Sequence, residues 1–118
     1  MQKWFNSFLY ASRGIFLMIK EEPNIRIEIC IGLVAIGVST WLKISMIEWC
    51  IILFCIGGVL TAEALNSSLE RLADQVTKEN HPNIANVKDM AAGGVLIMAI
   101  ISVVVGALIW GPKLLHPM

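Results

Sequence analysis

Three apolar segments dominate the chain after residue 24. Residues 90–110 are 21 uncharged positions in a row, enough to cross the hydrocarbon core of a bilayer as a helix. Residues 29–42 and 49–62 are uncharged runs of 14, so each spans a bilayer only if its helix continues past a charged residue. The pattern therefore predicts an all-α integral membrane protein, 1–118 as a single membrane-embedded domain, with spanning helices over 25–43, 45–76 and 88–110.

The first segment, residues 1–21, has a different pattern. At 100° per residue, its apolar side chains gather on one arc of about 140°, and most polar side chains occupy the remainder. The apolar set is Trp4, Phe5, Phe8, Leu9, Ile15, Phe16 and Ile19. This pattern is typical of an amphipathic surface helix lying in the membrane interface, although packing against another protein helix would produce the same pattern. Glu22-Pro23 should end the helix, because proline disfavours the helical conformation in its predecessor.

The composition agrees with a membrane protein. Of the 118 residues, 57% are apolar and 15% are charged, where about 25% charged is usual in soluble domains. Small domains have a high surface-to-volume ratio, and too few polar residues are present here to cover such a surface. Nine basic and nine acidic residues cancel, which argues against a nucleic-acid partner bound through phosphate neutralisation. The three cysteines lie in apolar runs without histidines at metal-binding spacing, so they indicate no metal site.

Basic residues predict the orientation in the membrane. Seven of them precede the first span or lie between the second and third: Lys3, Arg13, Lys20, Arg26, Arg71, Lys78 and Lys88. Only Lys43 and Lys113 fall on the opposite side. Because basic residues concentrate in cytoplasmic segments, the N-terminus and the 71–88 connection should be cytoplasmic and the C-terminus outside. The protein should therefore be a multi-pass protein of a cell membrane.

The second predicted span carries a polar stripe. Glu63, Asn66, Glu70 and Asp74 follow one another at intervals of three or four residues, which places them within about 80° of one helix face. For Glu70 and Asp74 alone, a solvated helix end would explain the charges. Glu63 directly follows the apolar run 51–62, where an ionisable side chain is expensive to keep. The stripe therefore indicates a functional site near the cytoplasmic surface.

Two further charged groups should lie at the same surface. Lys88-Asp89 opens the third span, and Glu22, Arg26 and Glu28 open the first. These charges would also be explained by membrane anchorage, or by an ion pair between Glu22 and Arg26 at i, i+4. Gathered together, however, the carboxylates suit a magnesium ion and the cations suit phosphate groups. The chemistry indicated is the handling of phosphate next to lipid.

These motifs resemble the prokaryotic diacylglycerol kinase and undecaprenol kinase family. The resemblance rests on residues 63–70 (EALNSSLE), 74, 81–82 (HP) and 85–94 (ANVKDMAAGG), and it extends to 10–14 (YASRG) and 22–27 (EPNIRI). Nearly the whole chain aligns without gaps. The resemblance implies a bacterial inner-membrane protein with an N-terminal surface helix, three transmembrane helices and a homotrimer whose active sites lie at subunit boundaries.

The resemblance also implies roles for individual residues. Glu63 matches the base that takes the proton from the lipid hydroxyl, and Glu22 and Glu70 match the carboxylates that hold magnesium-ATP. Further nucleotide contacts match Tyr10, Glu79, His81, Lys88 and Asp89, and polar residues lining the catalytic site match Asn66 and Asp74. The region near the lipid substrate matches Lys3, Asn24, Arg26 and Glu28. Two positions depart from the family pattern: Asn80 replaces an aromatic residue, and Lys3 replaces a common arginine.

The implied activity is an ATP-dependent lipid kinase. The acceptor is diacylglycerol, giving phosphatidic acid, or undecaprenol, giving undecaprenyl phosphate. Asn24, Arg26 and the 91–94 segment favour undecaprenol, whereas Glu28 favours diacylglycerol. A small proton-coupled transporter with Glu63 as relay is an alternative, but it predicts polar residues through the full bilayer depth, and the outer half is almost entirely apolar. An assembly subunit without chemistry would leave the polar stripe unexplained.

Overall fold

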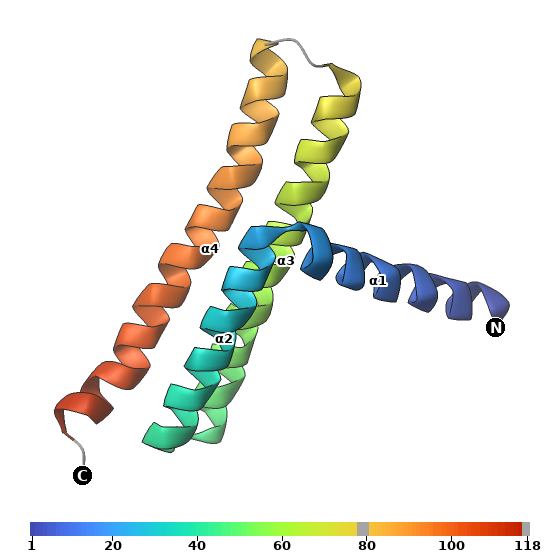
Figure 1. The fold of residues 1–118 in the computed structure, drawn as a ribbon. Helices are drawn as coiled ribbons and strands as arrows, with labels where there is room; N and C mark the ends of the chain where they lie inside the picture. Colours follow the sequence, from blue (N-terminus) through green and yellow to red (C-terminus); the bar gives the residue numbers. More distant parts are fainter. Residues whose placement is uncertain (78–80, 117–118) are drawn as a thin grey trace.

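The structure, a computed structural model, describes residues 1–77 and 81–116, and these form four helices and no strand (Figure 1). The helices are α1 (Gln2–Glu21), α2 (Pro23–Leu42), α3 (Met46–Val76) and α4 (Pro82–Leu115). By length and composition, α2, α3 and α4 are apolar and long enough to cross a membrane. The predicted all-α class and the three candidate spans are therefore confirmed.

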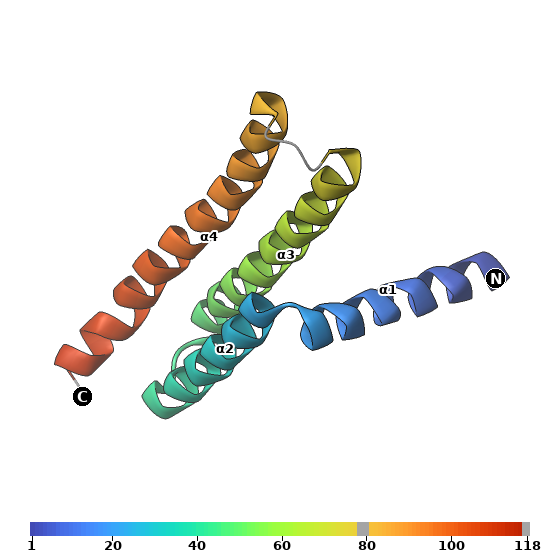
Figure 2. The same ribbon diagram turned by 45° about the horizontal axis from the view of Figure 1, so that its top comes forward.

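A single extended residue separates α1 from α2. Glu22 has φ −106° and ψ 106°, and Pro23 occupies the first turn of α2, where its missing N–H costs nothing. The carbonyl groups at the end of α1 are capped by Arg26, whose Nη1 donates to the Ile19 and Lys20 oxygens at 2.9 Å each. The chain therefore turns sharply, and α1 leaves the bundle sideways, with the N-terminus far from the other helices (Figures 1 and 2).

The other three helices pack side by side. α3 and α4 make the most extensive contact, and α2 packs mainly on α3. At the contact of α3 and α4, Gly58 leaves room for the Met98 side chain, which would have to shift if a Cβ atom stood 2.6 Å from its Cε. At the contact of α2 and α3, a Cβ atom at Gly32 would lie 3.0 Å from Cγ2 of Ile56, so there is room for no more than a small residue. Small residues at helix contacts are the usual way in which membrane helices pack closely.

The best-packed region lies at the end where α2 connects to α3. Buried Ile44, Ile52 and Ile109 form its centre. Nearby, the indole Nε1 of Trp110 donates to Oγ of the fully buried Ser39 at 3.1 Å and so links α4 to α2. This region holds the three spanning helices together at the end opposite α1.

Large apolar side chains cover the outside of the bundle. Phe54, Val103 and Leu108 are each at least 70% exposed, which suits contact with lipid and not with water. α3 has 31 residues and is about 46 Å long, more than a hydrocarbon core of about 30 Å requires. Figure 1 shows α3 and α4 continuing well past the level where α1 meets α2. One end of the α3–α4 pair therefore extends past the α1–α2 bend.

α4 is longer than the predicted 88–110 segment. It begins at Pro82, and the ring of His81 accepts a hydrogen bond from the backbone N–H of Asn83 at 3.2 Å, which caps the new helix. Proline is favoured in the first turn of a helix, so these residues were the sequence signal for the earlier start. The helix also continues past the apolar run to Leu115. The prediction was too short because it followed the uncharged residues alone.

Candidate functional site

The polar stripe of α3 runs from the inside of the bundle to its exposed end. Glu63 is only 4% exposed, and Asn66 and the adjacent Ser67 are 8% and 6% exposed. Glu70 and Asp74, one and two turns further along, are exposed. The stripe therefore connects a buried carboxylate with two accessible ones.

Glu63 lies against polar groups of α2. Nδ2 of Asn24 donates to Oε1 of Glu63 in a long hydrogen bond of 3.5 Å, and the Glu28 carboxylate is near enough to feel the charge of Glu63. One turn along α3, Nδ2 of Asn66 donates to Oε1 of Glu70, also at 3.5 Å. Within the described residues, Oε2 of Glu28 and Oδ1 of Asn66 are buried without a hydrogen-bond partner. Buried polar atoms normally have partners, so these two mark a place suited to a polar ligand.

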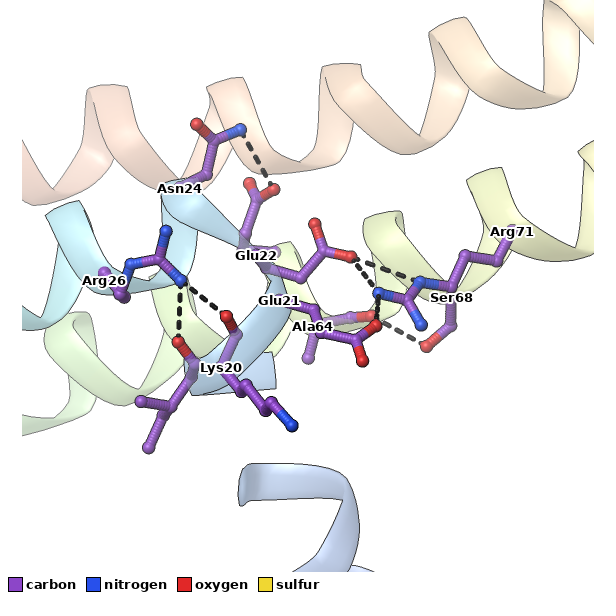
Figure 3. A network of polar contacts seen from close by, with 10 residues as sticks. Lys20, Glu21, Glu22, Asn24, Arg26, Ala64, Ser68 and Arg71 are labelled. Carbon is purple, nitrogen blue, oxygen red and sulfur yellow. Dashed lines mark hydrogen bonds and ion pairs between the residues drawn. The ribbon is translucent and has the colours of Figure 1, made fainter. Parts of the chain in front are cut away.

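A second cluster surrounds the bend between α1 and α2. Arg71 of α3 donates from Nε and Nη2 to the same oxygen, Oε1 of Glu22, at 3.2 and 2.8 Å (Figure 3). Its Nη2 also donates to Oε1 of Glu21 at 3.0 Å. The Glu22–Arg26 ion pair considered from the spacing does not form, because Arg26 caps α1 and Arg71 takes the Glu22 carboxylate. Glu22 is thus fixed to the α3 segment that follows Glu63.

A third cluster joins α3 to α4. Nζ of Lys88 lies 2.6 Å from Oδ1 of Asp74, and Glu70 adds a further favourable electrostatic interaction with the Lys88 ammonium group. Asp89 is exposed and forms no ion pair among the described residues. Because α4 starts at Pro82, Lys88-Asp89 does not open the helix as expected but lies in its second turn. Glu70, Asp74 and Lys88 thus form an exposed charged surface next to the buried part of the stripe.

The remaining predicted residues lie away from these clusters within one chain. Tyr10 of α1 is 64% exposed, and the guanidinium of Arg13 lies 5.8 Å from the centre of its ring. Lys3 is exposed near the free end of α1, which points away from the bundle (Figure 2). Glu79 lies outside the described residues.

An apolar groove lies beside the α1–α2 bend. Its volume is about 400 Å³, and its lining residues include Ile19 of α1, Ile29 of α2 and Leu60 of α3. Thr61 and Ala64, which flank Glu63 in the sequence, also line the groove. A hydrophobic chain in the groove would therefore lie within about one helical turn of the buried carboxylate.

Comparison with known proteins identifies the family of this chain. The family described as prokaryotic diacylglycerol kinase matches residues 9–110, most of the chain. The chain belongs to this family.

Three relatives within the kinase family illustrate its range. An undecaprenol kinase of Bacillus subtilis is 36% identical over 114 residues, covering 97% of this chain and 93% of that protein. A diacylglycerol kinase of Synechocystis sp. is 32% identical over 113 residues, covering 95% of this chain and 65% of the relative. A diacylglycerol kinase of Helicobacter pylori is 31% identical over 115 residues, covering 97% of this chain and 86% of that protein. Relatives with both names thus align along nearly the whole chain.

In this member of the kinase family, sequence reasoning missed two residues of the site. Arg71 had been counted only as one of the basic residues that set the orientation, yet it makes three hydrogen bonds to the acidic bend. Its position directly after Glu70 places it beside the stripe and was the available signal. Ser67 was given no role within the 63–70 motif, but it is buried next to Asn66.

Proposed function

We propose that this chain is a lipid kinase that transfers the γ-phosphate of ATP to the hydroxyl group of diacylglycerol or undecaprenol. Membership of the prokaryotic diacylglycerol kinase family and the names of the relatives support this activity. The observation that carries the proposal is Glu63, a buried carboxylate on an apolar membrane-spanning helix. Such a group is retained at a membrane helix only where it serves a function.

In the proposed reaction, Glu63 is the general base. Its carboxylate accepts the proton of the lipid hydroxyl while the hydroxyl oxygen attacks the γ-phosphorus of ATP. A new P–O bond to the lipid forms, the bond between the γ-phosphorus and the bridging oxygen breaks, and ADP leaves with that oxygen. The Asn24 amide orients Glu63 by donating to Oε1, so Oε2 remains for the substrate proton.

Magnesium is the metal that the family implies. The available ligands are carboxylate oxygens, which is the type of ligand that magnesium prefers. Among the described residues, no three or more His, Cys, Asp or Glu side chains form a metal-binding group. Magnesium in ATP-using enzymes needs only one or two carboxylates, with phosphate oxygens and waters completing its coordination. We assign this role to Glu70 and Glu22, whose carboxylate oxygens are the hard ligands that magnesium prefers. When bound, the ion would neutralise charge on the transferring phosphates.

The nucleotide-binding residues are proposed from the family motifs. Lys88 offers an ammonium group beside Glu70 and Asp74, where it would contact phosphate oxygens. The remaining proposed contacts are Tyr10, Glu79, His81 and Asp89, with Asn66 and Asp74 lining the catalytic site. The proposed lipid-facing residues are Lys3, Asn24, Arg26 and Glu28.

We further propose a homotrimer with sites shared between subunits. Lys3 and Tyr10 are exposed residues of α1, and this helix points away from the bundle (Figure 2), so they would reach a site only on a neighbouring copy. The extensive exposed apolar surface of α3 and α4 is available for contact with lipid or with another copy. The seven-to-two division of basic residues supports a cytoplasmic N-terminus and site and a C-terminus outside.

The test is phosphate transfer from labelled ATP to each lipid separately. The purified full-length protein is assayed in micelles containing diacylglycerol, undecaprenol or neither lipid, and labelled product is separated from ATP. Transfer to one acceptor well above the lipid-free background supports the proposal and identifies the substrate. Absence of transfer to both acceptors, in a preparation that binds ATP, would contradict it.

A further inference from the structure

The contact between Arg71 and the α1–α2 bend has an unusual geometry. Both hydrogen bonds from Arg71 to Glu22 end on one oxygen, Oε1, and none reaches Oε2. Among residues 1–77 and 81–116, no group donates a hydrogen bond to Oε2 of Glu22. An ionised carboxylate accepts several bonds through its two oxygens. The arginine therefore fixes the direction of the carboxylate and leaves one oxygen for another ligand.

The charge of Arg71 is offset by a second acid. Glu21 accepts a hydrogen bond from Nη2 of Arg71 at 3.0 Å, on the nitrogen that also contacts Glu22. Two carboxylates and one guanidinium leave this cluster with one net negative charge. These three groups together would attract a divalent cation at Oε2 of Glu22, and Arg26, which caps α1 at the same bend, offsets part of their charge.

The backbone at Glu22 is held by both helices, but its side chain is not. The Glu22 N–H donates to the Met18 carbonyl at 2.9 Å, and the Glu22 carbonyl accepts from the Arg26 N–H at 3.4 Å, so the direction of the carboxylate depends on its side-chain partners. Its side chain is partly buried, at 23% exposure, whereas Arg71 and Glu21 are each more than 40% exposed. A metal ligand at a bend needs a partner that orients it, and keeping that orientation is the usual task of residues that hydrogen-bond a ligand.

We propose that Arg71 is a positioning residue for the metal ligand Glu22: it holds Oε1 so that Oε2 faces magnesium-ATP. This inference rests on the proposed function, because it assumes that Glu22 binds the metal of the nucleotide. The two nitrogens on one oxygen restrict the carboxylate more than a single ammonium group would. Glu21 contributes by holding Arg71 and by balancing its charge.

The test measures metal-nucleotide binding directly. Mn²⁺ is titrated into the purified full-length protein with ATP in micelles, and free Mn²⁺ is followed by electron paramagnetic resonance. Arg71→Ala should raise the dissociation constant about 10-fold or more, the usual loss when a partner of a metal ligand is removed. Arg71→Lys should recover part of the affinity. Lys20→Ala, which removes one positive charge from the end of α1 without touching Glu22, is the matched control and should bind as wild type.

A double-mutant cycle separates positioning from general stabilisation. Since Arg71 acts through Glu22, Arg71→Ala should add little further loss to a Glu22→Gln protein. In lipid phosphorylation, Arg71→Ala should raise the magnesium concentration for half-maximal rate, while kcat at saturating magnesium stays within a few-fold of wild type. Thermal unfolding of each variant in the same micelles identifies any variant that is misfolded. If Arg71→Ala is misfolded, Arg71→Lys is compared with wild type in its place.

Three results would overturn the inference. Unchanged Mn²⁺ binding in Arg71→Ala would show that Glu22 needs no support, and tighter binding would show that Arg71 competes with the metal. Losses that add fully in the double variant would show that Arg71 acts independently of Glu22. If wild-type protein binds Mn²⁺–ATP and only the Arg71 predictions fail, the proposed kinase function still stands. If wild-type protein neither binds Mn²⁺–ATP nor phosphorylates either lipid, both proposals are wrong.

Discussion

Replacing Glu63 by glutamine is the most direct test of the proposed chemistry. The glutamine side chain would keep the shape of the glutamate and an oxygen that accepts the Asn24 hydrogen bond, but it would no longer accept a proton. Loss of a general base lowers a rate by about 10²- to 10⁴-fold. That loss corresponds to a barrier higher by about 2.7 to 5.4 kcal/mol.

The structure also predicts the effect of this substitution on stability. Glu63 is 4% exposed and lies close enough to Glu28 for the two carboxylates to repel each other. Glutamine removes both the buried charge and the repulsion while it retains the contact with Asn24. The unfolding temperature of Glu63→Gln should therefore equal or exceed that of wild type, although the phosphate-transfer rate of this variant should be about 10²- to 10⁴-fold lower.

The assay combines three measurements on one preparation in micelles: initial rates of labelled phosphate transfer to the accepted lipid, ATP binding, and thermal unfolding. Glu48→Gln is the matched control, because Glu48 caps α3 at the opposite end of the helix and pairs with Lys113. Its rate should stay within a few-fold of wild type. A Glu63→Gln protein that folds, binds ATP and turns over within a few-fold of wild type would remove Glu63 from the chemistry.

The site and the fold support three further predictions. A topology reporter fused after Met118 should be active only outside the cytoplasm, and activity inside would reverse the proposed orientation. Glu70→Gln should raise the magnesium requirement without changing the oligomer size by analytical ultracentrifugation; unchanged magnesium dependence in both this variant and Glu22→Gln would place the metal elsewhere. Ser39→Ala should lower stability by about 1 kcal/mol because the Trp110 indole N–H loses its partner, and an unchanged unfolding midpoint would show that this bond contributes nothing.

Features that depend on one stretch of chain were predictable. Uncharged runs located the three candidate spans, and Glu22-Pro23 located the end of α1, because bilayer thickness and proline stereochemistry act locally. The shared face of Glu63, Asn66, Glu70 and Asp74 followed from helix periodicity, because all four lie on the continuous helix α3.

Contacts between distant residues were not predictable. Arg26 was expected to pair with Glu22 or lie near the lipid, but the sharp turn brings the end of α1 within its reach. Arg71 reaches Glu22 only because of the angle at which α1 and α2 meet beside α3. Ser39 meets Trp110 for a similar reason, since their contact depends on how α2 and α4 cross. Hydrophobic periodicity contains no information on these angles.

The one-residue connection at Glu22 leaves the chain no slack. Any tilt of α1 relative to the bundle must be absorbed by the backbone angles of the same residue whose carboxylate Arg71 holds. A longer connection would let α1 move while the carboxylate stayed in place. Here the two movements are mechanically coupled, so a tilt of α1 would displace the carboxylate that we propose as a metal ligand. Inserting a single glycine beside Glu22 would uncouple them.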